Sequence, residues 1–220
     1  MNNLTLLIPA KHESGSLPLV LDELKKYNLK ILIVMEKEDI ETSEAIKNYN
    51  VKILYQKIKG YGSALIEGIE YINTDFMCIF NADGSFDPAE LKGMHEASNN
   101  FDFIFGTRYQ ENCSSKDDTY LTYIGNKIFS SIGKFFFGLK TTDILYTFIL
   151  GKTSYFKNLK LKEKDFRICV EIPINIKSKD FSYTNSISNE RARLKGEKKV
   201  NEFIDGFKIL TYLFRRFFKF

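Results

Sequence analysis

The stretch FMCIFNADGSFDP, residues 76–88, decides the fold. It opens with an apolar run, Phe76 to Phe80, which is typical of a parallel strand buried on both faces. Asn81, Ala82 and Asp83 follow directly, so a carboxylate is expected where the strand ends and solvent begins. In an open α/β sheet, ligands bind beyond the carboxyl ends of the strands. The stretch therefore predicts an α/β fold with a ligand site at the end of this strand.

The same pattern extends over the first hundred residues, where short apolar runs alternate with longer segments of helical period. We expect strands at Leu4–Ile8, Lys30–Met35, Val51–Tyr55, Phe76–Phe80 and Phe101–Phe105, and helices at Leu17–Tyr27, Ile40–Asn48, Gly62–Ile72 and Pro88–Ser98. This alternation predicts a mostly parallel central sheet flanked by helices.

Polar residues also follow three other strands of this expected sheet. The first strand runs into the segment from Pro9 to Glu13, the second into Glu36, and the third toward Gly60 and Gly62. All of these strand ends should converge on one edge, so we expect their side chains to surround a single site.

Asp83 is the best candidate for a metal ligand at this edge. Mg²⁺ and Mn²⁺ prefer oxygen ligands and commonly use one or two carboxylates, with diphosphate oxygens and water completing the shell. The alternative is purely structural: Asp83-Gly84 is a frequent turn signal, and Asp87 before Pro88 suits a helix N-cap.

Two aromatic-rich helices are expected in the second half of the chain. The segment Tyr120 to Leu139 has a wide apolar arc, which fits either an acceptor-docking surface or packing on the core. The C-terminal segment spaces Phe203, Phe207, Leu210, Phe214 and Phe217 by four and three residues, among Lys208, Arg215, Arg216 and Lys219. Such a basic amphipathic helix is typical of proteins that lie on a membrane surface.

The composition fits one folded domain of 220 residues, with 44% hydrophobic and 27% charged residues. A net charge of +4 is low for a nucleic-acid binder. The three cysteines, Cys78, Cys113 and Cys169, form no C-x-x-C pair, and the chain has neither a secretory signal pattern nor an 18-residue apolar stretch. We therefore expect a cytoplasmic protein that lies on the cytoplasmic face of a membrane.

Six motifs in collinear order resemble those of family-two glycosyltransferases of the GT-A fold, nearest the dolichyl- and polyprenyl-phosphate sugar transferases. LTLLIPAKHES (4–14) resembles P-A-Y-N-E, KGYGSALIEGI (59–69) resembles G-x-G-x-A-L, and FNADGSFDPAEL (80–91) resembles D-A-D-G-x-x-D-P. FIFGTRY (103–109) resembles G-S-R-Y, TTDILYTF (141–148) resembles D-x-x-S-G-F, and ERARLKGEKKV (190–200) resembles R-x-x-G-x-S-K. The resemblance implies the GT-A nucleotide-diphospho-sugar transferase fold.

The resemblance also implies roles for particular residues. The donor nucleotide would meet Pro9, Ala10, Glu13, Glu36, Gly60, Gly62, Asn81, Ala82 and Asp83. Asp83 would be the principal metal ligand and Asn81 a weak one, because Asn81 stands where the family has the first aspartate of D-x-D. Glu36 likewise lies where the family has an Asp-Asp pair.

On the acceptor side, Arg108 would contact the acceptor's phosphate, and a basic loop with Arg191, Arg193, Lys198 and Lys199 would cover the diphosphate. The catalytic residues would be Asp83, Arg108 and Asp143. A lipid phosphate is already ionised and needs no strong base, whereas a sugar hydroxyl would need one. Asp143 is then the best candidate for this base, and a helix N-cap is its alternative.

The implied activity is that of an inverting, metal-assisted hexosyltransferase. It would move a sugar from a UDP- or GDP-linked donor to a polyprenyl (dolichyl or undecaprenyl) phosphate or a related lipid-linked acceptor. We expect a nucleotide-sugar-binding half at 1–106, an acceptor-binding half at 107–200 and the amphipathic helix at 201–220. Two alternatives remain: transfer to a sugar hydroxyl in cell-surface polysaccharide assembly, and a degenerate nucleotide-binding protein without activity.

Overall fold

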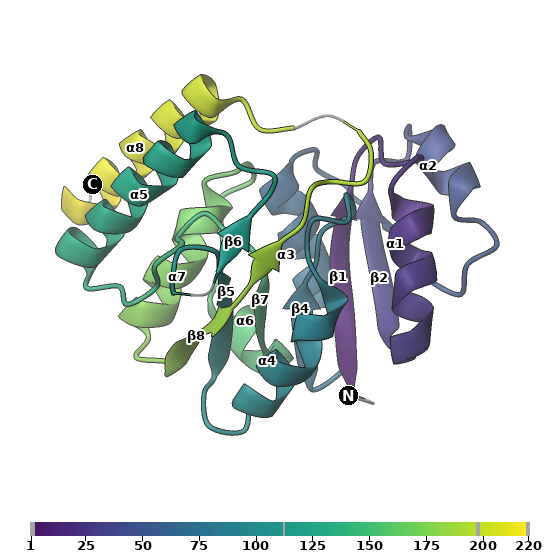
Figure 1. Cartoon of the computed structure of the whole chain (residues 1–220), viewed down its shortest axis with the longest axis horizontal. Coiled ribbons are helices and arrows are strands. Elements are labelled where there is room, and N and C mark those ends of the chain that lie inside the picture. The colour runs from purple at the N-terminus through teal and green to yellow at the C-terminus, as the bar shows by residue number, and fades with distance from the viewer. Residues whose placement is uncertain (1–2, 112, 197–198, 219–220) are drawn as a thin grey trace.

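The computed structural model describes residues 3–111, 113–196 and 199–218, arranged around one central sheet (Figure 1). The sheet has seven strands in the order β3-β2-β1-β4-β7-β5-β8. These strands are β1 (Leu4–Ala10), β2 (Lys30–Met35), β3 (Lys52–Tyr55), β4 (Phe76–Ile79), β5 (Phe103–Thr107), β7 (Ile149–Lys152) and β8 (Tyr183–Ile187). A second, two-stranded sheet joins β6 (Ser114–Ser115) to β9 (Asn189–Glu190). All five strands expected from the sequence are present, with ends shifted by up to two residues.

The first four strands form the parallel half of the sheet. Strand β1 lies between β2 and β4, with Thr5 opposite Lys30 and Leu4 opposite Phe76, and β2 pairs with β3. Because all three connections cross over, the carboxyl ends of these strands lie along one edge. This edge is the one to which the sequence assigns the ligand site.

Strand β7 interrupts the parallel order. It is antiparallel to both β4 and β5, so β5 does not lie beside β4. The sequence analysis missed β7 and β8. β7 is only four residues long, and β8, YTNSI, is an edge strand without a buried face, so neither carries the pattern of a buried strand.

Helices cover both faces of the sheet. One face of the sheet packs against α1 (Leu17–Leu24), α4 (Leu91–Ala97) and the residues that follow α2 (Ile40–Ala45). The other face packs against α3 (Tyr61–Tyr71), α6 (Thr153–Asn158) and α7 (Ile168–Ser178). Two expected helices are divided, because 3₁₀ turns at Lys25–Tyr27 and Pro88–Glu90 adjoin α1 and α4. The α/β prediction, with helices on both sides of a mostly parallel sheet, is confirmed.

Helices α5 (Tyr120–Phe137) and α8 (Glu202–Phe218) lie side by side at one end of the molecule (Figure 1). Thr119 caps α5 by accepting a hydrogen bond from the Thr122 amide, and Gly138, at φ +64°, ends it. A small apolar core joins these two helices to α7, through Val170, Ile174, Ile209 and Leu213 among others. Each helix therefore buries only part of its apolar surface. In the part of the chain that the structure describes, no helix is long and apolar enough to cross a membrane.

Candidate active site

A cavity of about 610 Å³ opens beyond the carboxyl ends of β1, β2 and β4. Most of the residues expected to meet a donor nucleotide line it, from four separate segments: Pro9, Ala10, Glu13, Glu36, Gly60, Asn81, Ala82 and Asp83. Gly62 does not line the cavity. It packs against the chain before α7, where an added Cβ would lie 2.1 Å from the Glu163 carbonyl oxygen. The convergence of the strand ends on one site is therefore present in the structure.

Asp83 lies both in a turn and on the cavity wall. Its Oδ1 accepts a hydrogen bond from the Ser85 amide at 3.0 Å, and Gly84 between them has φ +83°. The other oxygen, Oδ2, lies 3.9 Å from Nη2 of Arg193. Asp87 caps the following 3₁₀ turn by accepting from the Ala89 amide at 2.9 Å. Asp87 is therefore the cap that the structural alternative predicts. Asp83 forms the predicted turn and also lines the cavity.

Asn81 and Asp83 present the oxygen atoms that a hard divalent cation requires. The Asn81 amide nitrogen donates to Ser85 Oγ at 3.2 Å, so the amide carbonyl oxygen is the atom available to a cation. Among the residues that the structure describes, no group of three or more His, Cys, Asp or Glu side chains could hold a metal ion. This donor set fits a Mg²⁺ or Mn²⁺ ion that takes its remaining ligands from phosphate oxygens and water.

The segment after β9 passes over the carboxyl ends of the strands (Figure 1). The Leu194 amide donates to the Asp83 carbonyl oxygen at 2.8 Å, and Lys199 Nζ lies 4.0 Å from Glu13 Oε1. Arg193 binds both oxygens of Asp117, at 3.1 and 2.6 Å. Arg193 and Lys199 line the cavity, and Lys198 lies outside the described residues.

Arg191, in the same basic segment, points elsewhere. Its two terminal nitrogens bind the Glu23 carboxylate at 2.8 and 2.9 Å, and one of them also donates to the Phe86 carbonyl oxygen at 2.8 Å. It is not among the residues that line the cavity. The structure therefore separates Arg191 from Arg193, which the sequence analysis grouped together.

Arg108 lies at the end of β5 and is 8% exposed. Its guanidinium binds Asp143 at 2.7 and 3.0 Å, Asp118 at 3.1 Å and Glu190 at 2.9 Å. Burial alone would lower the Arg108 pKa, but the neighbouring carboxylates, Asp143 first, raise it well above its ordinary value. Arg108 is therefore a permanent cation that three carboxylates surround.

Asp143 lies behind Arg108 and is completely buried. Besides the guanidinium, its carboxylate accepts hydrogen bonds from the Arg108 amide at 3.2 Å and from the Asn126 side chain. It is followed by a turn, not a helix, so the N-cap alternative is wrong. Asp143 does not line the cavity, and its visible role is to position Arg108.

The acidic character of the cavity was not apparent from the sequence. Among the described residues, its lining includes the carboxylates of Glu13, Glu36, Asp83, Asp117, Asp118, Asp165, Glu190 and Asp205, against the cations Lys11, Arg108, Arg193 and Lys199. Burial raises the pKa of both Glu13 and Glu190. An anionic ligand in this cavity therefore needs additional positive charge.

Aromatic side chains that the sequence analysis did not single out also line the cavity. Tyr61 stacks on Phe166 with ring centroids 5.0 Å apart, and its hydroxyl is 2.8 Å from Thr147 Oγ1. Phe86 and Tyr146 line another part of the wall, with centroids 4.8 Å apart. These residues are far apart in the sequence, and no local pattern distinguishes them from ordinary core aromatics.

An open, mostly parallel sheet with a nucleotide-sized cavity at its carboxyl edge and a carboxylate turn after β4 defines the GT-A class of nucleotide-diphospho-sugar transferase folds. Residues 5–160 match the model of glycosyl transferase family 2. The chain therefore belongs to glycosyl transferase family 2.

Solved structures and curated relatives agree with this assignment. Glucosyl-3-phosphoglycerate synthase of Mycobacterium tuberculosis, in complex with Mn²⁺, UDP and glucosyl-3-phosphoglycerate, is similar to this chain with a TM-score of 0.76 and 10% identity, over 98% of this chain and 80% of that one. Mannosyl-3-phosphoglycerate synthase of Rubrobacter xylanophilus is similar with a TM-score of 0.74 and 12% identity, over 98% and 73% of the two chains. At these identities the likeness shows the fold.

Uncharacterised glycosyltransferases of Mycobacterium bovis and Mycobacterium tuberculosis are 28% identical over 105 residues. The match spans 47% of this chain and about half, 48%, of each relative.

Proposed function

We propose that the chain transfers a sugar from a nucleoside diphosphate sugar to a lipid-linked acceptor at a membrane surface, in a metal-assisted, inverting reaction. The observation that carries this proposal is the cavity at the carboxyl edge of the sheet, which Asp83, Asn81, Arg193 and Lys199 line together. A diphosphate could there meet oxygen ligands for a cation and two basic side chains at once.

The charge of the cavity supports the use of a divalent cation. Acidic side chains outnumber basic ones in its lining, so a UDP- or GDP-linked donor would add negative charge to an already acidic site. Asp83 and Asn81 would hold Mg²⁺ or Mn²⁺, which when bound neutralises the leaving diphosphate. Related structures contain UDP with Mn²⁺ or with Mg²⁺.

Arg193 and Lys199 would bind the phosphate oxygens of the donor's diphosphate. In the structure, Arg193 contacts the carboxylates of Asp117 and Asp83, and Lys199 contacts that of Glu13. Phosphate oxygens would replace these carboxylates as partners, because a guanidinium can bind two phosphate oxygens at once.

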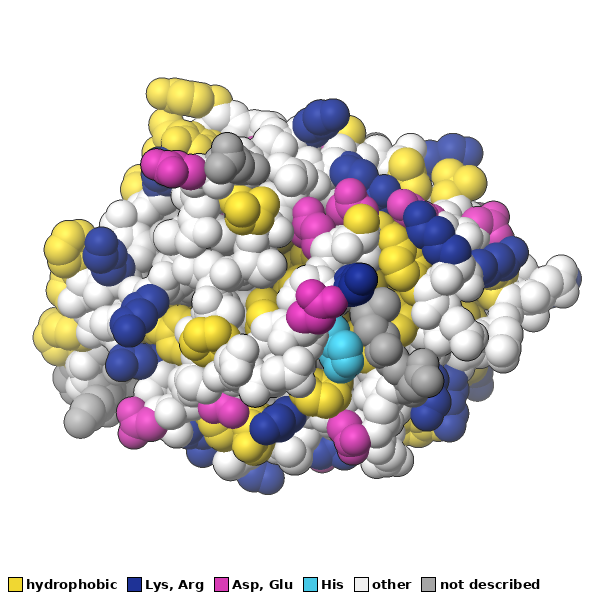
Figure 2. All heavy atoms as spheres, turned by 60° about the horizontal axis from the view of Figure 1, so that its bottom comes forward, with side chains coloured by type: hydrophobic (Ala, Val, Ile, Leu, Met, Phe, Trp, Pro, Cys, Tyr) yellow, Lys and Arg dark blue, Asp and Glu magenta, His cyan; other side chains and the backbone are white. Residues whose placement is uncertain are grey.

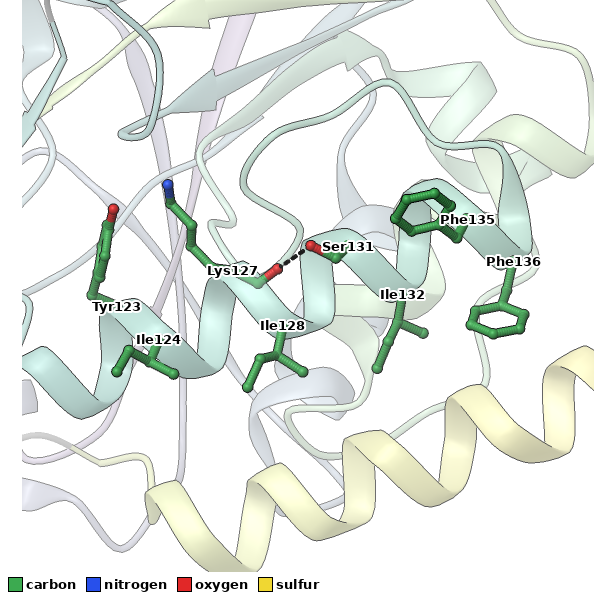
Figure 3. Close-up of a pocket in the computed structure, with 8 residues that line it drawn as sticks. All are labelled: Tyr123, Ile124, Lys127, Ile128, Ser131, Ile132, Phe135 and Phe136. Carbon is green, nitrogen blue, oxygen red and sulfur yellow. Dashed lines mark hydrogen bonds between the residues drawn. The ribbon is translucent and has the colours of Figure 1, made fainter.

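The exposed faces of α5 and α8 support attachment to a membrane. On α8, Phe203, Phe207 and Phe214 are 77%, 68% and 62% exposed. On α5, a shallow apolar groove of about 400 Å³ is lined by Tyr123, Ile124, Lys127, Ile128, Ser131, Ile132, Phe135 and Phe136 (Figure 3). In Figure 2, basic and apolar side chains adjoin one another at the left edge, the side on which Figure 1 places α5 and α8. Aromatic and basic residues together suit an anionic lipid surface, and the cytoplasmic face is the one we propose.

Two kinds of acceptor fit a protein that lies on a membrane through α5 and α8. The family resemblance favours a polyprenyl phosphate, and the surroundings of Arg108 favour the hydroxyl of a saccharide carried on such a lipid. In either case α5 contributes side chains to both surfaces, because Thr122 and Asn126 line the cavity while Tyr123 and Ile124 line the groove. A degenerate nucleotide-binding protein remains the non-enzymatic alternative, and hydrolysis of sugar nucleotides with and without Mn²⁺ separates it from an enzyme.

Nucleotide binding tests the proposal at the level of the site. Calorimetric titration of the purified chain with UDP and with GDP should show binding of at least one of them that depends on Mn²⁺. Asp83→Asn should weaken that binding by about tenfold or more, since about 1.4 kcal/mol of lost attraction is one factor of ten. Asp87→Asn is the matched control, because Asp87 lies in the same loop but outside the cavity lining. If wild type binds neither nucleotide with Mn²⁺ present, the proposed function is wrong.

A further inference from the structure

We infer that the acceptor group is a neutral hydroxyl of a saccharide, not a phosphate, because the carboxylates that line the cavity around Arg108 already bind the basic side chains described there. This inference rests on the proposed function and specifies its acceptor. These carboxylates are those of Asp117, Asp118 and Glu190, which all line the cavity and are named here the acidic wall.

Arg108 and Arg193 are the described basic side chains of the cavity that bind this wall, and four of the five N–H groups of the Arg108 guanidinium already donate to carboxylates. Nη1 donates to both Asp118 and Glu190, and Nε and Nη2 donate to Asp143. The faces of the guanidinium lie against aromatic rings, 4.4 Å from the Tyr146 centroid and 5.1 Å from the Tyr109 centroid. A phosphate could bind the Arg108 guanidinium through two N–H groups only by displacing a buried carboxylate.

The side chains around Arg108 carry a net negative charge. Three carboxylates surround one guanidinium, and protonation of Glu190, whose pKa burial raises, would still leave a surplus of negative charge. An acceptor phosphate here would face like charges in a partly buried site, which is unfavourable. Arg193 binds Asp117 of the wall at 2.6 Å and lies 3.9 Å from Asp83, and Lys199 lies 4.0 Å from Glu13. Both cations are assigned to the diphosphate in the proposed function.

A saccharide suits the same wall. Ionised carboxylates accept hydrogen bonds from hydroxyl groups, and these bonds are stronger than those between neutral groups. The stacked pair Tyr61 and Phe166, which is only partly buried, adds apolar surface to the cavity, against which the face of a sugar ring can pack.

Asp117 is the carboxylate of the wall that we assign as proton acceptor. Nη2 of Arg193 lies 2.6 Å from Asp117 and 3.9 Å from Asp83, so Asp117 is at the border between donor and acceptor sides. When Arg193 turns to the diphosphate, both Asp117 oxygens lose their guanidinium partner. The acceptor oxygen then bonds to the anomeric carbon and its proton passes to Asp117. The bond from that carbon to the diphosphate oxygen breaks, and its electron pair leaves with the nucleoside diphosphate.

Binding of two kinds of soluble acceptor analogue tests the inference. The full chain, saturated with Mn²⁺ and the nucleoside diphosphate that it binds, is titrated with octyl phosphate and with a panel of octyl glycosides. We expect at least one glycoside to bind about tenfold more tightly than octyl phosphate. Octyl phosphate binding as tightly as every glycoside, or more tightly, would overturn the inference while nucleotide binding, and with it the proposed function, stands.

A charge variant gives an independent readout. Asp118→Asn removes one negative charge beside Arg108 and should increase the affinity for octyl phosphate several-fold, with an unchanged Kd for the nucleotide. Glu44→Gln is the control, because it removes the same charge from an exposed pair with Lys47. An Asp118→Asn protein that binds nucleotide normally but gains no affinity for octyl phosphate would contradict the charge argument.

Discussion

Asn81 is the residue at which this chain departs most clearly from the family motif, and the structure shows how the site accommodates it. Its amide nitrogen donates to Ser85 Oγ, and both Asn81 and Asp83 line the cavity, so the proposed cation site has one carboxylate where the motif has two. We expect metal affinity to be the property that this substitution weakens.

Asn81→Asp should therefore tighten metal binding. A second carboxylate adds attraction for a divalent cation, and the Mn²⁺ concentration for half-maximal nucleotide binding should fall by about tenfold, equivalent to about 1.4 kcal/mol. The measurement is a Mn²⁺ titration at fixed nucleotide, with Asn81→Ala as the comparison that removes the oxygen. An unchanged Mn²⁺ requirement in Asn81→Asp would place the cation away from residue 81.

Asp143 should matter chiefly to stability. Asp143→Asn leaves the buried Arg108 without its main partner, which costs about 3–5 kcal/mol in comparable buried pairs. Urea unfolding measures this loss, and Asp22→Asn, which breaks an exposed pair with Lys25, should leave the free energy of unfolding nearly unchanged. An Asp143→Asn protein of normal stability but without activity would instead support a direct role in catalysis.

At the scale of single residues, the sequence placed the donor-side candidates well because residues after strands converge by topology alone. It could not show that Arg108 is surrounded by carboxylates from three other segments, since Asp118, Asp143 and Glu190 are 10 to 82 positions away. The roles assigned to individual site residues stay predictions.

At the scale of helices and strands, the exposed apolar face of α8 is the feature whose binding partner is least determined. Only Asp205, Ile209 and Leu213 are buried on it, while its exposed phenylalanines lie among basic residues. The same period of three and four residues that predicts the helix also predicts an apolar face, but whether that face meets the core or a membrane is not encoded in the period.

Replacing exposed aromatics of α8 should separate membrane binding from folding. Phe207→Ser with Phe214→Ser should reduce binding to anionic liposomes by about tenfold or more, because each buried phenylalanine side chain contributes about 1.5–3 kcal/mol. Stability should change little, since both side chains are already exposed. Phe101→Ser, an exposed phenylalanine remote in sequence from α5 and α8, is the control in the sedimentation assay. Unchanged liposome binding by the double variant would exclude α8 as the membrane contact.

The elements that the sequence missed have a common cause. β7 is short and pairs antiparallel between β4 and β5, and β8 is a polar edge strand, so both are formed by neighbours distant in the chain and not by their own pattern. Long, strongly periodic elements were predicted closely: α5 ends two residues before the expected Leu139, and α8 begins one residue after the expected start at residue 201. Lys219 and Phe220, at the expected end of the last helix, lie outside the described residues.

For the molecule as a whole, one sheet carries both sides of the site. β8, from the expected acceptor-binding half, pairs with β5, within which the expected division at residue 106 falls, so that division does not separate two folding units. The division into donor and acceptor halves stays a prediction, as does the cytoplasmic location.

Transfer of radiolabelled sugar is the most direct test of glycosyltransferase activity. The assay supplies a panel of UDP- and GDP-linked sugars with Mn²⁺, and offers a short-chain polyprenyl phosphate and the same lipid bearing a saccharide, to wild type and to Asp83→Ala. The account predicts label in the saccharide-bearing lipid with wild type and a loss of about a hundredfold or more with Asp83→Ala, in line with about 2.7 kcal/mol of electrostatic stabilisation removed. Transfer that Asp83→Ala retains in full, or no transfer from any donor to either lipid, would contradict it.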